Sequence, residues 1–163
     1  MPNTEIELNP IDFITIGTIG PKGRRQFMLQ AGKGGQLVSV IIEKQQAHQL
    51  AEAVREMLAD MGDTDKVNLD DFDMTLREPI EPQFRVANMG LGHDETHDRV
   101  ILVARELIIV SDDSDIPDDI SPSVVRFWGS RQQFRALSEH TFDVVEAGRA
   151  DPKTNGHVIY YWT

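Results

Sequence analysis

The sequence contains no cysteine. This absence excludes disulfides, thiolate nucleophiles and every zinc site that depends on cysteine. Long apolar runs are missing as well, because the longest one, at residues 100–110, is interrupted by Arg105 and Glu106, and a membrane span needs about 20 apolar residues. The first ten residues also lack the basic-then-apolar order of a secretion signal. We therefore expect a cytoplasmic protein that does not enter a membrane.

Basic residues are the minority among the charged ones, with 16 Lys and Arg against 27 Asp and Glu and a net charge of −11. Such a balance favours solubility and makes nucleic-acid binding an unfavoured function. Aromatic residues reach only 7%, while the apolar share of 40% is that of an ordinary globular protein. A chain of 163 residues suffices for one buried core but is short for two, so we expect a single domain over residues 1–163.

Two segments of the chain, residues 37–62 and 124–149, resemble each other at an offset of 87 positions. In both, a β-type run leads into a helix-type pattern, and paired glutamines fall at the same place. Matching apolar patterns imply matching packing. We therefore predict an internal pseudo-repeat of residues 11–62 and 83–149, separated by an acidic linker at residues 63–82.

Alternating apolar residues and glycine-rich turns predict three strands before each helix. The expected strands are residues 12–19, 25–31, 36–42, 83–92, 99–110 and 124–128, and the expected helices are residues 44–61 and 131–147. One helix per half cannot cover both faces of a sheet. The predicted fold class is therefore α+β, with two βββα halves forming a largely antiparallel, curved sheet on which the two helices pack.

The regions outside this pattern have their own expected roles. Residues 1–10, flanked by two prolines, are interpreted as an extended leader. The linker contains apolar residues that we expect to dock on the domain. The last residues, 156–163, read GHVIYYWT, and this apolar composition predicts an ordered C-terminal strand whose edge makes a homodimer plausible.

The stretches IGTIGPKGRRQFMLQAGKGGQLVSVIIEKQQ and PIEPQFRVANMGLGHDETHDRVILVARE resemble the bacterial domain-of-unknown-function family 3090, found mainly in actinobacteria. The resemblance covers nearly the whole chain and includes the AGR at residues 147–149. It implies neither an activity nor catalytic residues. Members commonly continue into a cysteine-rich tail that looks like a zinc ribbon. Here ADPKTNGHVIYYWT stands in its place, so the resemblance implies no zinc for this chain.

Two histidines, His93 and His97, share six residues with three carboxylates in the predicted turn at residues 93–98. Such groups could bind a divalent ion or a ligand, or supply an acid and a base. The order is H-D-E-T-H between two strands, however, and not H-E-x-x-H on a helix. A solvated turn is the favoured interpretation, and we expect no metal and no cofactor.

Gln45-Gln46 and Gln132-Gln133 open the two predicted helices. At a helix N-terminus these side chains could hydrogen-bond a ligand, particularly an anion. They could equally cap the helix, and Ser130 three residues before Gln133 completes the pattern of a capping box. Capping is the favoured interpretation.

A basic cluster of Lys22, Arg24, Arg25 and Lys33 stands out in this acidic chain. Arg24 and Arg25 in particular could bind an anion or RNA. Successive turns of a meander lie at opposite ends of its sheet, so we expect the cluster to be divided.

The sequence contains no complete catalytic motif. Whether the protein is an enzyme is left open, although the missing motif favours a protein that is not one. The favoured hypothesis is a non-catalytic binding or regulatory protein that acts through a protein partner or through self-association. The alternatives are an enzyme or binding protein for a small anionic or phosphorylated ligand and, more distantly, an RNA-associated protein. A cleft in which titratable groups converge would favour the enzyme.

Overall fold

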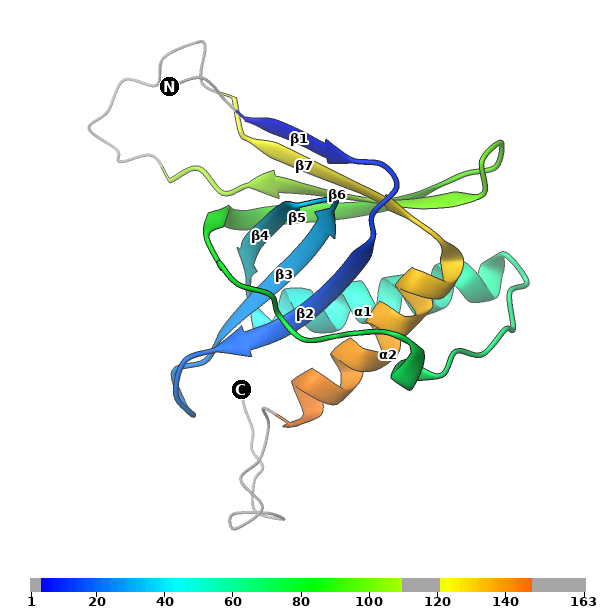
Figure 1. Cartoon of the computed structure of the whole chain (residues 1–163), viewed down its shortest axis with the longest axis horizontal. Helices are drawn as coiled ribbons and strands as arrows, with labels where there is room; N and C mark the ends of the chain where they lie inside the picture. Colours follow the sequence, from blue (N-terminus) through cyan, green and yellow to red (C-terminus); the bar gives the residue numbers. More distant parts are fainter. Residues whose placement is uncertain (1–3, 110–120, 148–163) are drawn as a thin grey trace.

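A computed structural model describes residues 4–109 and 121–147. The fold is α+β, as predicted, with a seven-stranded, mostly antiparallel sheet and two helices packed on it (Figure 1). Its elements are β1 (Glu5–Leu8), β2 (Phe13–Ile19), β3 (Gln26–Lys33), β4 (Gln36–Ile42), α1 (Lys44–Asp60), the 3-10 helix η1 (Leu69–Asp71), β5 (Pro82–Asp94), β6 (Arg99–Glu106), β7 (Val124–Gly129) and α2 (Arg131–Ala147).

The strand order is β1-β7-β6-β5-β4-β3-β2. The pairs β4–β5 and β1–β7 are parallel, and the other four pairs are antiparallel. Although β1 and β2 lie at opposite ends of this order, only residues 9–12 join them. The sheet must therefore curve until its two edges approach each other, and the Ile11 amide donates a hydrogen bond of 2.8 Å to the Trp128 carbonyl at that point.

Both helices are amphipathic, and each has 17 residues. Their apolar faces pack on the curved sheet and on each other (Figure 1). The buried residues of α1 are Ala47, Leu50, Ala51, Val54 and Leu58, and those of α2 are Phe134, Ala136, Leu137, Ser138, Thr141 and Val145. These two stripes and the inner face of the sheet make one core.

The two halves have the same element order and the same strand register. In the first half Leu29 lies between Ile16 and Val40 on neighbouring strands, and in the second Leu102 lies between Leu91 and Phe127. Residues at the same place in these registers, or 87 positions apart in the helices, are called corresponding residues below.

Corresponding residues meet where the two helices cross. The Ser138 hydroxyl donates a hydrogen bond of 2.7 Å to the carbonyl of Ala51, its own counterpart 87 positions earlier. The Arg55 guanidinium likewise lies 4.0 Å from the ring centroid of its counterpart, Phe142. Contact between counterparts is what a two-fold axis produces. The halves are therefore related by an approximate two-fold rotation about an axis between α1 and α2.

The same relation explains β1, a strand that the sequence analysis did not predict. Ser39 pairs with Pro82 at the start of β5, and the corresponding residue Arg126 pairs with Glu7 in β1. Strand β5 pairs with both β4 and β6, whereas in the other half two strands share these pairings, β1 with β7 and β2 with β3. The residues first interpreted as a leader form a strand because the alternation in EIEL buries Leu8 while the two glutamates stay exposed.

Other expectations differ from the structure mainly at boundaries. The strand expected at residues 83–92 extends to Asp94, and the one expected at residues 99–110 ends at Glu106. The Leu107 amide makes one more hydrogen bond of 2.7 Å to β5, at the Arg85 carbonyl next to the last pair, Val86 with Glu106. The linker docks on the sheet as expected. The C-terminal strand predicted for residues 156–163 lies outside the described residues.

Candidate functional site: a groove between α1 and β5

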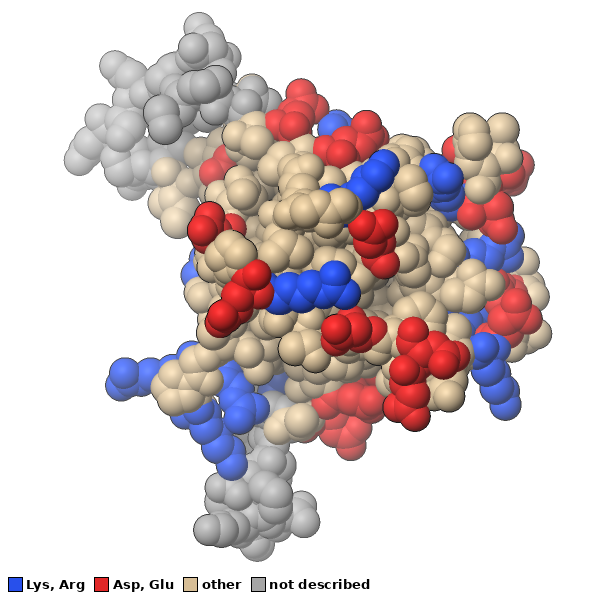
Figure 2. Space-filling model, viewed as in Figure 1, with Lys and Arg blue, Asp and Glu red and all other residues tan. Residues whose placement is uncertain are grey.

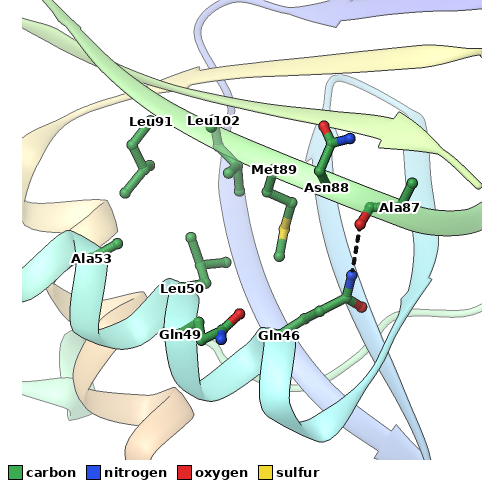
Figure 3. A pocket seen from close by; sticks show the side chains of 10 residues that line it. Gln46, Gln49, Leu50, Ala53, Ala87, Asn88, Met89, Leu91 and Leu102 are labelled. Carbon is green, nitrogen blue, oxygen red and sulfur yellow. Dashed lines mark hydrogen bonds between the residues drawn. The ribbon is translucent and has the colours of Figure 1, made fainter.

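A groove with a volume of about 310 Å³ separates α1 from β5 (Figure 3). It lies between the helix of the first half and the sheet of the second. Its lining consists of Gln46, Gln49, Leu50, Ala53, Ala87, Asn88, Met89, Gly90, Leu91 and Leu102.

The floor of the groove is apolar. Met89 and Leu91 project from β5 toward α1, where Leu50 faces them, while Asn88 points to the other side of the strand (Figure 3). Leu50 is buried, whereas Met89 and Leu91 are only half-buried. The groove exists because β5 pairs with β4 only as far as Arg85, so within residues 4–109 and 121–147 no strand lies beside the following part of β5 on this side.

The chemistry of the lining supports binding and offers no reactive group. None of the ten lining residues carries a titratable or nucleophilic side chain, and the polar ones are Gln46, Gln49 and Asn88. An acid–base or nucleophilic mechanism requires such groups near the bound substrate. The groove can therefore hold an apolar ligand with a few amide hydrogen bonds, but its own side chains cannot carry out those reactions.

The corresponding surface of the other half, between α2 and β2, is covered. There the linker lies across the edge of β2 and leaves only a small hollow of about 120 Å³, bordered by Ile14, Gln133 and linker residues 71–77. Ile14 and Thr15 are 3% and 0% exposed, whereas their counterparts Met89 and Gly90 are half-buried and exposed. The same surface is thus closed in one half and open in the other.

A difference in side-chain size contributes to this asymmetry. His140 of α2 reaches β2, and its Nε2 lies 2.9 Å from the Ile16 carbonyl oxygen. The counterpart of His140 in α1 is Ala53, which leaves the same space beside Leu91 open. Burial lowers the pKa of His140, and the carbonyl of Ile16 and the charge of Asp143 only partly oppose this effect. The imidazole is therefore favoured in its neutral form.

Two of the four predicted glutamines hold the fold together in the same way. Gln46 accepts a hydrogen bond of 2.7 Å from the Glu43 amide, and its Nε2 donates to the Val86 carbonyl at 3.1 Å. Gln133 accepts from the Ser130 amide at 2.8 Å and donates to the Ile11 carbonyl at 3.1 Å. Each side chain therefore caps its helix and ties it to the main chain of the other half, at β5 for Gln46 and between β1 and β2 for Gln133.

The neighbouring glutamines, Gln45 and Gln132, are exposed on the outer faces of their helices. Gln45 borders a second hollow with Lys44, His48 and Val145. The structure thus separates each predicted pair into one glutamine that caps the helix and one that points to solvent.

The turn after β5 holds its histidines in separate pairs. His93 Nε2 lies 2.7 Å from Asp98 Oδ1, and His97 Nδ1 lies 2.8 Å from Asp94 Oδ2. Hydrogen bonding to His97 is the main cause that lowers the pKa of Asp94, and hydrogen bonding to His93 does the same for Asp98. No group of three or more metal-ligating side chains comes together in the described part of the chain.

A chain of charges connects this turn to α2. Arg131 donates to Asp98 at 2.8 Å and to Asp63 at 3.4 Å, and Arg135 donates to Asp63 at 2.9 Å. Burial raises the pKa of Asp63, but hydrogen bonds from the Asp65 amide and from both guanidinium groups together lower it below its ordinary value. The two arginines at the start of α2 are therefore occupied by the linker and the turn.

The basic cluster is divided, as predicted. Lys22, Arg24 and Arg25 are exposed on the turn between β2 and β3, and basic side chains gather at the lower left of Figure 2, at this end of the hairpin. Lys33 lies at the opposite end of β3, where its Nζ donates to the Asn9 carbonyl at 2.7 Å. Elsewhere on the face in Figure 2, acidic side chains are interspersed with further basic ones among uncharged residues.

The groove was not predicted from the sequence, because nothing in the sequence marked Met89 and Leu91 as accessible. A single sequence gave no signal for it, because the opening depends on where β4 and β5 separate and on which half the linker covers.

Comparisons with known proteins agree with the resemblance seen in the sequence. A family model described as a protein of unknown function, DUF3090, matches residues 6–156, and the chain therefore belongs to that family. The match includes both helices and the whole groove. Among curated proteins and among solved structures, no match was found. No helix in the described ranges is long and apolar enough to cross a membrane.

Proposed function

We propose that this member of the DUF3090 family is a non-catalytic binding protein whose α1–β5 groove receives an extended, apolar segment of a protein partner. The observation that carries the proposal is the linker, an extended segment that covers the edge of β2 beside α2 in the other half, where it borders Ile14 and Gln133. The proposal places this binding in the cytoplasm, in keeping with the cysteine-free composition.

The docked linker shows how the sheet of this protein holds an extended segment, here on the face that points away from the helices, because Thr15 and Gln30 alternate with core residues along their strands. The Thr15 hydroxyl donates to the Met74 carbonyl at 2.8 Å, and the Gln30 amide bonds to both the N–H and the carbonyl of Arg77 at 2.8 Å. Leu76 packs so closely on Gly17 that a Cβ there would lie 2.7 Å from Leu76 Cγ. Main-chain hydrogen bonds and alternate side chains in pockets are the usual means of binding an extended segment.

The open groove offers comparable features. It has apolar side chains from both elements and a stretch of β5 beside which the described residues place no strand. It also has the amide of Gln49 on its rim for a polar contact. An unpaired strand edge beside an apolar groove is a template for a chain in extended conformation. A second copy of this protein could supply that chain, in which case the binding would be self-association.

The alternative of a small anionic or phosphorylated ligand has less support. An anion needs accessible cations, but Arg131 and Arg135 are already paired with Asp63 and Asp98. The cations of the β2–β3 turn lie on a different part of the surface from the groove.

The test is selection from a displayed library of random peptides against the protein and two matched variants. Ala53→Arg fills the groove, and Ala59→Arg places the same side chain on an exposed site of α1 outside it. We expect enriched peptides with apolar residues at alternate positions, whose affinity falls at least about tenfold, or about 1.4 kcal/mol, in Ala53→Arg. Their affinity for Ala59→Arg should be unchanged.

Two results would overturn the proposal. One is that every enriched peptide binds Ala53→Arg as well as it binds the unmodified protein. The other is that phosphorylated metabolites stabilise the protein against heat and that this effect is lost in Arg131→Ala, which would favour the anionic ligand.

A further inference from the structure

We infer that the α1–β5 groove contains a site for one planar ring with a hydrogen-bond donor, namely the tryptophan, tyrosine or histidine side chain of the partner segment. This ring site lies beside Ala53, between Leu50 and Leu91 (Figure 3). The inference rests on the proposed function, because it names the residue by which that segment is held. Its basis is the imidazole of His140, which reaches the main chain of β2 at the corresponding place in the other half.

The capping glutamines show that the two places correspond. Each of them donates to two successive main-chain carbonyls of the other half, at 3.1 and 3.4 Å in both cases. These carbonyls lie five and four residues before Leu91 in one half, and five and four residues before Ile16 in the other. The helix residue seven positions after the glutamine is His140 in α2 and Ala53 in α1. Ala53 therefore stands to Leu91 as His140 stands to Ile16.

The main-chain acceptor of the ring site is the Leu91 carbonyl. Leu91 pairs with Leu102, and the same place in the other half is taken by the pair of Ile16 and Leu29. The Ile16 carbonyl accepts a hydrogen bond of 2.9 Å from His140 Nε2, so it points away from β3 and toward α2. Because carbonyl directions follow the register of an antiparallel pair, the Leu91 carbonyl points away from β6 and toward α1. In the described part of the chain, no strand lies on that side of Leu91.

The groove is large enough for a ring. Helix α2 packs closely on β2, whereas α1 stands off from β5 and leaves a space of about 310 Å³ between them. An apolar cavity of about 150 Å³ suffices for benzene, so this groove has room for a ring and for part of the chain that carries it. Leu50 and Leu91 supply the apolar surface for its faces, and the single methyl group of Ala53 leaves the space open.

The charges around the ring site favour a donor over an anion. None of the lining residues is charged, and Glu56 is exposed three residues after Ala53, which makes the two neighbours on the helix surface. In the other half burial lowers the pKa of His140, and the negative charge of Asp143, the counterpart of Glu56, partly raises it. A ring beside Ala53 therefore meets a carbonyl oxygen and a carboxylate, which attract an N–H or O–H group and disfavour an acidic side chain.

The test uses two ring molecules of nearly the same shape, indole and indene, of which only indole has an N–H donor. Each is added to the full chain, isotope-labelled at its nitrogen atoms and methyl groups, and NMR spectra are recorded. We expect both to shift the methyl signals of Leu50, Met89 and Leu91, because both fill the apolar space. Only indole should shift the amide nitrogen of Gly92, since this nitrogen is bonded to the Leu91 carbonyl carbon and responds when that carbonyl accepts a hydrogen bond.

Two matched variants test the position of the ring. Ala53→His supplies the ring from α1 itself, and Ala59→His places the same side chain on an exposed site outside the groove. In Ala53→His we expect the shift of Gly92 without indole and the loss of indole binding, whereas Ala59→His should behave as the unmodified protein. Equal effects of indole and indene on Gly92, or no groove signal shifted by either, would overturn the inference. Both of these results come from the unmodified protein, so they do not depend on the folding of a variant.

The proposed function can fail separately from this inference. Peptides selected on the groove should carry tryptophan, tyrosine or histidine at one fixed position, and alanine at that position should weaken binding at least about tenfold. Groove-dependent peptides without such a residue would overturn the inference and leave the proposed function standing. Indole bound as expected, without any groove-dependent peptide, would refute the proposed function and leave the ring site itself standing.

Discussion

The two capping glutamines allow a quantitative test of the two-fold relation. Replacing Gln133 by alanine removes the hydrogen bond that it accepts from the Ser130 amide and the one that it donates to the Ile11 carbonyl. A typical intramolecular hydrogen bond contributes about 0.5–1.5 kcal/mol to stability. The two bonds together predict a loss of about 2 kcal/mol in the free energy of unfolding.

The same change at Gln46 should cost the same amount, because its bonds to the Glu43 amide and the Val86 carbonyl match in kind and in length within 0.1 Å. For a domain of this size, about 2 kcal/mol corresponds to a fall in Tm of roughly 4–8 °C. Urea unfolding followed by circular dichroism gives the free energies, and a thermal melt gives Tm.

Two kinds of control separate the interactions. Gln45→Ala and Gln132→Ala change the exposed neighbours and should stay within about 0.5 kcal/mol of the unmodified protein. Gln133→Glu keeps the acceptor of the capping box but loses the donor to the Ile11 carbonyl, so its cost should reflect that hydrogen bond. If Gln46→Ala and Gln133→Ala are as mild as their neighbours, these side chains do not hold the fold, and their assignment as structural residues is wrong.

Three further predictions concern single sites. Gly17→Ala should lower stability by about 1–3 kcal/mol, because its methyl group would overlap a linker leucine, whereas Gly90→Ala should be nearly neutral; chemical denaturation compares the two. Thr141→Val should raise stability by about 1 kcal/mol, because the buried Thr141 hydroxyl has no hydrogen-bond partner among the described residues and its counterpart in α1 is Val54; an unchanged or lower Tm would contradict this. The lowered pKa of Asp63 means that its ionised form contributes stability above the unfolded pKa of about 3.9, and this contribution is lost as the pH falls through the lower folded pKa. Asp63→Asn should therefore lose less stability than the unmodified protein between about pH 4 and pH 2, and parallel acid titrations would argue against the ion pairs.

Local signals predicted the helices to within one residue at each end. An apolar stripe at helical spacing and a capping box lie within the segment itself, so one sequence contains all the information that they need. The fold class followed because two such helices and six strand patterns admit few arrangements. Strand β1 was missed because its pairing with β7 joins residues more than a hundred positions apart.

The candidate site was not predictable for a related reason. That Gln46 and Gln133 cap helices is visible in the sequence, but their bonds to the main chain of the opposite half are not. The groove is open because the linker covers β2 and not β5. Neither Met89 nor Leu91 differs in type from a core residue, so composition alone could not mark them as a binding surface.

The approximate two-fold relation also indicates which differences between the halves concern function. Where counterparts make the same contact, as Gln46 and Gln133 do, the contact serves the fold, because both halves need it to fix a helix against a strand. Where counterparts differ, the fold does not demand the residue. His140 fills the space beside β2 and bonds to it, but Ala53 leaves the corresponding space open at a cost in buried contacts. The fold accepts this surface both in a closed and in an open form. Stability of the fold therefore does not explain why the α1–β5 groove is open, whereas binding of an occupant in the groove does.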